Sequence, residues 1–332
     1  MEEAIRERFN EDILAEARVR YGIAPEQIKL LDGFESFMFE FAKNGRDYIL
    51  RLGHSRRRTP ELIHGEVDWI NYLADGGAGV ARAVLSENGE LVELIDDDQG
   101  GQFLATAFVK ARGGSAWRDG YWNERMFVAY GRLLGRIHHL SKSYQPANPA
   151  WARPHWDDPL MQFASEIFPV ANTAVLSHYH DLMAYLRRLP QDRDSYGMIH
   201  QDAHGGNFFI DDDYHLTLFD FDDCVYGHFA YDLAMVLFYA ITNAPDPAAT
   251  ARQLWPPFMR GYREENDLHG RWLAEIPHFM KLREIDLYAQ LLSVFGDKPS
   301  GSNWVDGFMH GRRERIEQEL PYLEIEIERL TD

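Results

Sequence analysis

Residues 200–223 read HQDAHGGNFFIDDDYHLTLFDFDD, and this stretch is the best evidence of function in the chain. It places a candidate base, an amide and further carboxylates close together along the chain. Transfer of a phosphoryl group requires a carboxylate that orients the attacking hydroxyl and oxygen ligands that hold magnesium on the nucleotide phosphates. Asp202 can take the first role, while Asn207 and Asp220 can supply the hard oxygen donors that magnesium prefers. The pattern His-x-Asp-x-x-x-x-Asn therefore indicates a catalytic loop.

The residues around this loop predict its local structure. Gly205 and Gly206 allow a tight loop with backbone angles that other residues resist. The run FFI at 208–210, an acidic turn at 211–213 and the run HLTLFDF at 215–221 are typical of a two-stranded hairpin. An Asp and an Asn five residues apart are usually only turn residues when they stand alone. Here the order and spacing of the whole set favour a catalytic role.

The segments IHQDAHGGNFFI (199–210) and LTLFDFDDCVYGHFAYDLAMVLF (216–238) resemble the phosphotransferase enzyme family. This family includes aminoglycoside phosphotransferases, choline kinases, type II homoserine kinases and bacterial stress-response kinases. Carried over residue by residue, the resemblance implies that Asp202 is the catalytic base and that Asn207 and Asp220 are magnesium ligands. It covers nearly the whole chain and is strongest at 199–238.

Other positions of the two segments match the family less directly. His200 matches a histidine that braces the catalytic loop, and Asp232 in the sequence YDLA matches a structural aspartate. Gln201 departs from the family, because most members have glycine at this position, and a slight change of the local backbone is expected there. Asp222 is predicted to join a second metal ion or to orient a loop. Asp223 can contact either the substrate or only the helix that follows.

Composition sets bounds on the class of protein. The chain has 332 residues and 45% hydrophobic content, which is enough for a sizeable core in one large or two ordinary domains. The lone Cys224 cannot form an internal disulfide and indicates a reducing compartment. No apolar run reaches the roughly 20 residues that a membrane span requires, and the N-terminus is too acidic for a signal peptide. A cytoplasmic protein without a membrane partner is therefore expected.

The charge balance bears on possible partners. A net charge of −19 makes nucleic-acid binding unfavourable as a main activity, since phosphate backbones are captured by basic surfaces. A cationic acceptor would fit this balance, although acidity also serves solubility. The only basic cluster is Arg56-Arg57-Arg58. It can contact nucleotide phosphates or a partner, but a solvated loop is the commoner outcome for such a run.

The N-terminal third predicts a small sheet-rich lobe. An amphipathic helix is expected over residues 3–21, three strands over 28–53 with a hairpin turn at Asn44-Gly45, and a helix over 60–74. Further strands are expected around Asn88-Gly89 and within 103–114. The resemblance implies an α+β fold of the two-lobed protein-kinase type. Its antiparallel-sheet lobe (1–109) would bind the nucleotide, and its mainly helical lobe (110–332) would carry the catalytic loop and the acceptor site.

Six residues of the small lobe are predicted to bind the nucleotide cofactor. Arg51 resembles the strand cation that pairs with the phosphates, a position where better-known members have lysine, and Glu66 would be its ion-pair partner; an ordinary surface salt bridge is the alternative. The loop at 32–36 lies where a flexible cover over the phosphates is expected. The segment 106–109 resembles the hinge whose backbone bonds the adenine edge. The full set is Ser36, Arg51, Glu66, Ala107, Phe108 and Val109.

The rest of the chain is helical by pattern. Residues 124–140 resemble the long helix that begins the large lobe, with His138 and His139 in structural roles. Residues 141–159 are predicted to form an irregular insertion, either near the acceptor site or as a plain surface loop. Pro256, Pro257 and Pro277 are expected at helix breaks or first turns.

The sequence thus predicts an ATP- and Mg²⁺-dependent kinase. It would transfer the γ-phosphate to a hydroxyl of a small molecule such as an aminoglycoside, an amino alcohol, homoserine or a sugar. Alternatives are a protein Ser/Thr kinase of the stress-response type and a non-catalytic nucleotide-binding module. A metal hydrolase using His200 and His204 is a further rival, because histidines four apart share a face on a helix. The glycines that follow them argue against a helix.

Overall fold

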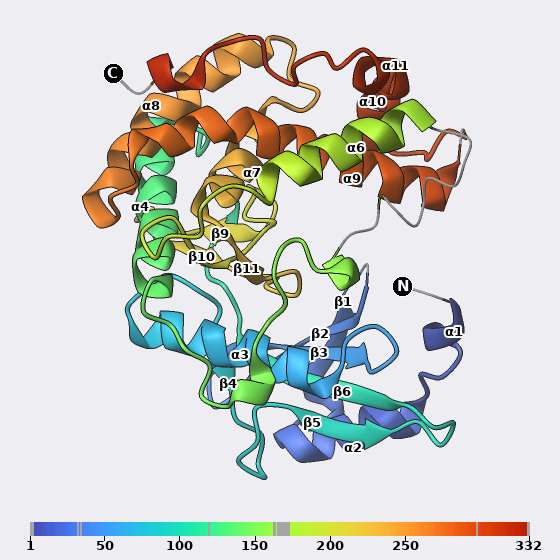
Figure 1. The fold of residues 1–332 in the computed structure, drawn as a ribbon. Helices are drawn as coiled ribbons and strands as arrows, with labels where there is room; N and C mark the ends of the chain where they lie inside the picture. Colours follow the sequence, from blue (N-terminus) through green and yellow to red (C-terminus); the bar gives the residue numbers. More distant parts are fainter. Residues whose placement is uncertain are drawn as a thin grey trace. The chain divides into compact units, whose positions relative to one another are not determined.

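Figure 1 shows the computed structural model of the chain, which describes residues 3–31, 33, 35–118, 120–161, 164, 173–296 and 298–330. The chain forms two compact units. The first, called the sheet unit, comprises Met1–Gly113, Tyr144–Arg153 and Thr217–Asp222. The second, called the helical unit, comprises Gly114–Ser143, Pro154–Leu216 and Asp223–Asp332. The predicted α+β class, with an antiparallel sheet in the N-terminal part and a helical remainder, is confirmed.

The sheet unit is built on one antiparallel sheet in the order β1-β2-β3-β6-β4, with β5 also paired to β6. Alternation of apolar and polar residues gives these strands their two faces. The predicted hairpin turn is confirmed, because Asn44 and Gly45 have φ angles of 52° and 73° between β2 and β3. The strands are β1 (Ile28–Leu31), β2 (Phe37–Lys43), β3 (Arg46–His54), β4 (Ala83–Val84), β5 (Glu93–Asp96) and β6 (Gln102–Val109).

The helices of this unit cover the sheet. The single helix predicted over 3–21 is wrong, because the structure has α1 (Glu3–Arg6) and α2 (Glu11–Tyr21) separated at Asn10. The Asn10 side chain accepts hydrogen bonds from the backbone N–H groups of Asp12 and Ile13, so it begins a new helix. The sheet unit also contains the short 3₁₀ turn η1 (Pro25–Gln27) and helix α3 (Pro60–Asp75).

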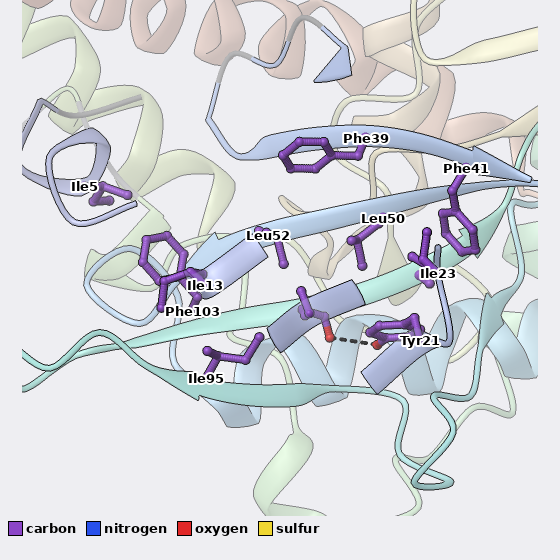
Figure 2. Packing of buried hydrophobic residues seen from close by; sticks show 13 residues of the cluster. Ile5, Ile13, Tyr21, Ile23, Phe39, Phe41, Leu50, Leu52, Ile95 and Phe103 are labelled. Atoms are coloured by element: carbon purple, nitrogen blue, oxygen red, sulfur yellow. Dashed lines mark hydrogen bonds between the residues drawn. The ribbon is translucent and has the colours of Figure 1, made fainter. Parts of the chain in front are cut away.

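One face of the sheet forms an apolar core with α1 and α2 (Figure 2). Ile13 and Tyr21 of α2 lie against Leu50, Leu52 and residues of β6. The Tyr21 hydroxyl donates a 2.9 Å hydrogen bond to the carbonyl of Ala105, so the polar end of this buried ring is satisfied. Because side chains alternate along a strand, Arg51 between Leu50 and Leu52 points to the other face, where α3 packs.

The helical unit contains longer helices and two small sheets. β11 pairs with β8, and β9 pairs with β7; a turn closed by the 3.1 Å bond from Asp211 N to His215 O leads from β9 towards β10. The helices are α4 (Glu124–Ser141), α6 (Thr173–Leu186), α7 (Phe229–Ile241), α8 (Pro247–Glu265), α9 (Ile276–Phe295), α10 (Asn303–Met309) and α11 (Arg312–Glu317). The strands are β7 (Gly114–Ser115), β8 (Tyr196–Ile199), β9 (Phe208–Ile210), β10 (Leu216–Leu218, whose last two residues belong to the sheet unit) and β11 (Val225–His228). The 3₁₀ turns are η2 (Pro149–Trp151, in the sheet unit), η3 (Pro159–Met161), η4 (Gly270–Glu275) and η5 (Ile327–Leu330).

Helices α4 and α8 meet backbone to backbone. A Cβ atom added to Gly131 would lie 1.9 Å from the carbonyl oxygen of Phe258, and one added to Gly261 would lie 2.0 Å from that of Val128. Any side chain at these positions would force the two helices apart. We call this contact the glycine seam; Gly135 also belongs to it, with Tyr262 O at 2.6 Å from its added Cβ.

The prolines show how this packing overrides local preference. Pro256 and Pro257 lie inside α8, so the prediction that they mark breaks or first turns is wrong. Pro277 does lie in the first turn of α9, as expected. A proline inside a helix removes a backbone hydrogen bond, but most of the α8 residues between Leu254 and Tyr262 are buried, and this packing holds the helix together. Within the described residues, no helix is long and apolar enough to span a membrane.

Candidate active site

The predicted catalytic loop connects β8 to β9, and its backbone is held by the carboxylate of Asp232. Oδ2 of Asp232 accepts a 2.9 Å hydrogen bond from the backbone N–H of His200, and Oδ1 accepts a 2.7 Å bond from that of Gln201. Gln201 has a φ of 70°, in the left-handed region that glycine adopts freely. This explains why glycine suits the position in other members of the predicted family. Here the two bonds to Asp232 help to hold Gln201 in a conformation that costs a non-glycine residue about 1–2 kcal/mol.

Asp232 is itself fixed by a buried chain of polar groups. His138 of α4 lies with Nε2 3.1 Å from Asp232 Oδ2 and Nδ1 2.8 Å from the hydroxyl of Tyr262. Asn266 donates a 2.7 Å hydrogen bond to the same hydroxyl. Burial lowers the pKa of His138, so the ring is neutral and donates through Nε2. The structural roles predicted for Asp232 and His138 follow from this network.

Asp202 projects from the loop with both carboxylate oxygens engaged. Oδ1 accepts a 2.9 Å hydrogen bond from Nη2 of Arg283 on α9. Oδ2 lies 3.3 Å from Nε2 of His204 and 3.1 Å from Nδ2 of Asn207. Burial raises the pKa of Asp202, but Arg283, His204 and His200 outweigh it and hold that pKa below its usual range. The carboxylate is therefore ionised and fixed in orientation.

Asn207 is oriented by the same group. Its amide nitrogen donates to the backbone carbonyl of Asp202 at 2.9 Å and to the Asp202 carboxylate at 3.1 Å. The amide oxygen, which is the atom that a hard cation takes, is thereby turned away from Asp202. The donor chemistry of Asn207 therefore fits the metal-ligand role that the sequence predicts.

The two histidines of the loop differ in surroundings. His200 is fully buried, and its Nδ1 accepts a 3.3 Å hydrogen bond from the backbone N–H of Asp202. His204 is partly exposed, and its Nδ1 accepts a 2.9 Å bond from Gly206 N, which leaves Nε2 to donate to Asp202. Residues 200–207 form a loop and not a helix. The two rings therefore do not share a helical face, as the metal-hydrolase hypothesis requires. Among the described residues, no group of three or more His, Cys, Asp or Glu side chains could hold a metal ion.

In the sheet unit, Arg51 and Glu66 form a buried, two-pronged ion pair. Nη1 and Nη2 of Arg51 donate to the two carboxylate oxygens of Glu66, each at 2.7 Å. Nε lies 3.3 Å from the hydroxyl of Thr106, and the guanidinium carbon lies 5.1 Å from the ring centre of Phe108. Burial opposes the charge, but Glu66, Asp222 and Asp220 together raise the pKa of Arg51. The predicted pair thus exists and is buried, which removes the surface salt bridge as an alternative.

A small cavity beside Arg51 is lined by further positively charged side chains. Its lining includes Ser36, Arg57, Arg58 and Asp222. Oδ2 of Asp222 accepts hydrogen bonds from Arg57 (2.6 Å) and Arg58 (3.1 Å), and Arg57 also pairs with Glu35. Burial raises the pKa of Asp222, but Arg58 and Arg57 hold it well below its usual range. Part of the basic cluster at 56–58 therefore faces a cavity and a carboxylate instead of forming a solvated loop.

The segment that carries Asp220 and Asp222 is anchored within the sheet unit. The backbone N–H of Ala81 donates to Leu218 O at 2.9 Å, and Leu218 N–H donates to Gly79 O at 2.8 Å. Phe221 is buried edge-on against Trp69 of α3, with ring centres 5.4 Å apart. Asp220 follows with a φ of 65°.

The remaining predicted residues lie in β6. Ala107 and Phe108 are paired with β3 on one side and β4 on the other, and Val109 N–H donates to Arg82 O at 2.9 Å. Their backbone groups therefore take part in the sheet, and the adenine contact stays a prediction. Asp32 and Phe34 of the predicted covering loop lie outside the described residues.

Sequence reasoning missed two arginines. Arg153 is buried and donates to the backbone carbonyls of Leu62 (2.9 Å) and Asp222 (2.6 Å). Its segment, Tyr144–Arg153, is bonded to α3 of the sheet unit through Tyr144 and Asp68, and the place of the predicted insertion near the acceptor stays a prediction. Arg283 of α9 is the other. Neither lies in a motif, so no local signal marked them.

Comparison with known proteins bears on these observations. The family model described as "Phosphotransferase enzyme family" matches residues 27–265. The chain belongs to the phosphotransferase enzyme family. An amicoumacin kinase of Bacillus subtilis (strain 168) is 37% identical over 322 residues, which cover 96% of this chain and 95% of that protein. An uncharacterised protein of Deinococcus radiodurans is 25% identical over 296 residues, covering 85% of this chain and 82% of its own length.

Solved structures agree with the family assignment. The amicoumacin kinase hAmiN in complex with AMP-PNP, Ca²⁺ and Ami is 34% identical, has a TM-score of 0.92 and covers 100% of both chains. A microcompartment-associated aminopropanol kinase has a TM-score of 0.72 at 21% identity, covering 94% of this chain and 98% of its own, and this likeness shows the fold alone. Within the family, this chain is a small-molecule kinase, that is, a phosphotransferase with an alcohol group as acceptor.

Proposed function

We propose that this phosphotransferase transfers the γ-phosphate of ATP to a hydroxyl group of a small-molecule acceptor, with Asp202 as the residue that orients that hydroxyl. The observation that supports this most directly is the Asp202 carboxylate, ionised and held by Arg283, His204 and Asn207. Such a fixed, charged acceptor of hydrogen bonds suits a reaction in which positioning contributes more than covalent chemistry.

The low pKa of Asp202 suggests how it acts. An ionised carboxylate can accept a hydrogen bond from the acceptor hydroxyl throughout the neutral range. It is a weak base, so it aligns the hydroxyl in the ground state and receives the proton only as the new bond to phosphorus forms. His200 supports this role by fixing the backbone of Asp202, because its Nδ1 atom accepts a hydrogen bond from the Asp202 N–H group.

On the nucleotide side, the sheet unit supplies fixed cations. Glu66 holds the guanidinium of Arg51 in one orientation, and Arg57, Arg58 and Ser36 line the adjoining cavity. We assign nucleotide-phosphate binding to these residues. The division into a nucleotide-binding lobe at 1–109 and a helical lobe at 110–332 stays a prediction. A guanidinium matches the planar geometry of a phosphate better than an ammonium does.

We propose Asn207 and Asp220 as ligands of a divalent cation, with Mg²⁺ as the natural ion. Bound there, the cation would neutralise negative charge on the phosphates. The amide oxygen of Asn207 is free of Asp202, and the Asp220 carboxylate is a hard oxygen donor. Asp222 is already bonded to Arg57 and Arg58, so it becomes available to a second metal ion only when these arginines leave it.

For the acceptor, we propose an amine-bearing hydroxyl compound, and Ami is the first to test. The support is the amicoumacin kinase of Bacillus subtilis and the hAmiN complex, both matched along nearly the whole chain. The net charge of −19 is compatible with a cationic acceptor. Cytoplasmic location remains a prediction.

The test is Mg²⁺-dependent release of ADP by the purified protein, alone and with Ami, amino alcohols, aminoglycosides, homoserine and a protein serine substrate. Asp202→Ala is expected to lower turnover by roughly 10² to 10⁴ fold. Asp213→Ala removes an exposed carboxylate of the nearby turn and should leave turnover unchanged. ATP binding without transfer to any acceptor would favour a non-catalytic module instead, and transfer only to the protein substrate would favour a protein kinase.

A further inference from the structure

Arg283 bonds the catalytic carboxylate from a helix distant in sequence. It lies on α9, and its Nη2 donates to Asp202 Oδ1 at 2.9 Å, across 81 residues of chain. Both side chains are shielded, with exposed fractions of 13% for Arg283 and 21% for Asp202. An ion pair of this kind fixes geometry more firmly than one in open solvent.

Tyr239 of α7 holds the guanidinium in place. Its hydroxyl receives hydrogen bonds from Nε (3.1 Å) and from Nη2 of Arg283, and its ring centre lies 5.4 Å from the guanidinium carbon. Nη2 thus donates both to Tyr239 and to Asp202. Rotation of the arginine away from Asp202 would break contacts at Tyr239 as well.

The loop is therefore braced twice within the helical unit. Asp232 of α7 holds its backbone at His200 and Gln201, while Arg283 of α9 holds the Asp202 side chain. The first brace fixes where the loop lies. The second fixes the rotation of the carboxylate about its own bonds, because it takes one oxygen and leaves the other facing His204 and Asn207.

We propose that Arg283 is a positioning residue for phosphoryl transfer, which sets the orientation of the Asp202 carboxylate toward the acceptor hydroxyl. This inference rests on the proposed role of Asp202. Arg283 acts through Asp202 and not on the nucleotide, so its loss should lower kcat for the acceptor and leave nucleotide affinity unchanged. Displacing a reacting group by about 1 Å can cost 10²-fold in rate.

Two substitutions separate charge from orientation. Arg283→Met removes both and should lower kcat by roughly 10- to 100-fold. Arg283→Lys keeps the charge but loses the planar fork that reaches Tyr239 and Asp202 together, so kcat should also fall. Among the described residues, the charged or titratable groups that interact with Asp202 include Arg283, His204, His200, Tyr239, Tyr130 and Tyr231. In both variants the loss should fall on kcat with the acceptor, while the affinity for the nucleotide stays unchanged, because Arg283 contacts Asp202 and Tyr239.

Arg312 provides a matched control. It is as shielded as Arg283, with 11% exposed, pairs with Glu284 of α9 at 2.7 Å and lies over the ring of Phe308 at 4.3 Å. Arg312→Met should therefore cost similar thermal stability without lowering kcat. Equal kinetic effects of Arg283→Met and Arg312→Met would show a merely structural role and overturn the proposal.

NMR of ¹³C-labelled aspartate at one constant neutral pH requires no acceptor. If the wild type phosphorylates no compound on the panel, the proposed function fails, and this spectrum decides the contact between Arg283 and Asp202 separately. A signal of the Asp202 carboxyl carbon that shifts in Arg283→Met but not in Arg312→Met supports the contact in solution. A signal that stays in place in Arg283→Met overturns the proposal.

Discussion

Asp286, one turn beyond Arg283 on α9, is buried without full compensation. Only 8% of the residue is exposed, and its Oδ1 atom has no hydrogen-bond partner among the residues that the structure describes. Burial raises the pKa of this carboxyl to about 7 from the usual 3.8, with Arg283 acting in the opposite direction. The other titratable groups around it are Tyr179 of α6 and Tyr231 of α7.

This raised pKa predicts a loss of stability as the pH increases. Since the folded-state pKa lies above the unfolded one, the favourable contribution is fully present below about pH 4 and is lost as the pH rises through about 7. At 1.36 kcal/mol for each pKa unit, the shift of about three units corresponds to ~4 kcal/mol at full ionisation. About 2 kcal/mol of that falls between about pH 5.5 and pH 8.

Asp286→Asn keeps the size of the side chain and removes the titration. We therefore expect the free energy of unfolding of the variant, relative to wild type, to rise by about 2 kcal/mol between about pH 5.5 and pH 8. Urea unfolding at a series of pH values measures this difference, and Asp181→Asn, which removes an exposed carboxylate of α6, is the control. A constant difference between Asp286→Asn and wild type across this range would show that the carboxyl titrates as it does in the unfolded chain, and would refute the reasoning.

Three further substitutions test other parts of the structure. Arg51→Lys retains the charge but cannot make both bonds to its glutamate, so nucleotide affinity should fall by roughly 10-fold in calorimetry; equal affinity would remove Arg51 from the phosphate site. Glu35→Gln frees Arg57 of one counter-ion and should tighten nucleotide binding by about 2- to 5-fold, whereas weaker binding would contradict the assignment. Gly261→Ala should destabilise the fold by about 1–3 kcal/mol, with Gly270→Ala, which meets open space, as the silent control in thermal unfolding.

The loop at 200–207 and the contact between Asp202 and Asn207 could be predicted because they are local, while the catalytic role of the loop stays a prediction. Asp202, Asn207 and their glycines lie within a few residues of one another, and such spacing survives in a linear sequence. Gln201 was noticed as a departure, but the left-handed angle that makes glycine suitable there is visible only in the structure. Arg283 could not be found in this way, because its contact with Asp202 depends on how α9 packs.

At two places the local sequence signal and the predicted helix boundaries disagree with each other or with the structure. Asn10 is a typical helix-beginning residue, so the break between α1 and α2 could have been predicted. The prolines at 256 and 257 predict a helix break that does not occur. The burial of α8 residues around them outweighs the low helix propensity of proline. Long-range packing decides such cases, and one sequence does not display it.

The glycine seam between α4 and α8 bears on how this enzyme can be re-engineered. Side chains that line an acceptor site can exchange size and rotamer, and their neighbours absorb part of the change. Gly131 and Gly261 have no such latitude, because carbonyl oxygens lie about where a Cβ atom would be placed. A library that seeks new acceptors should therefore leave the seam untouched. Variants altered at the seam would drop out through misfolding before any change of substrate range could be selected.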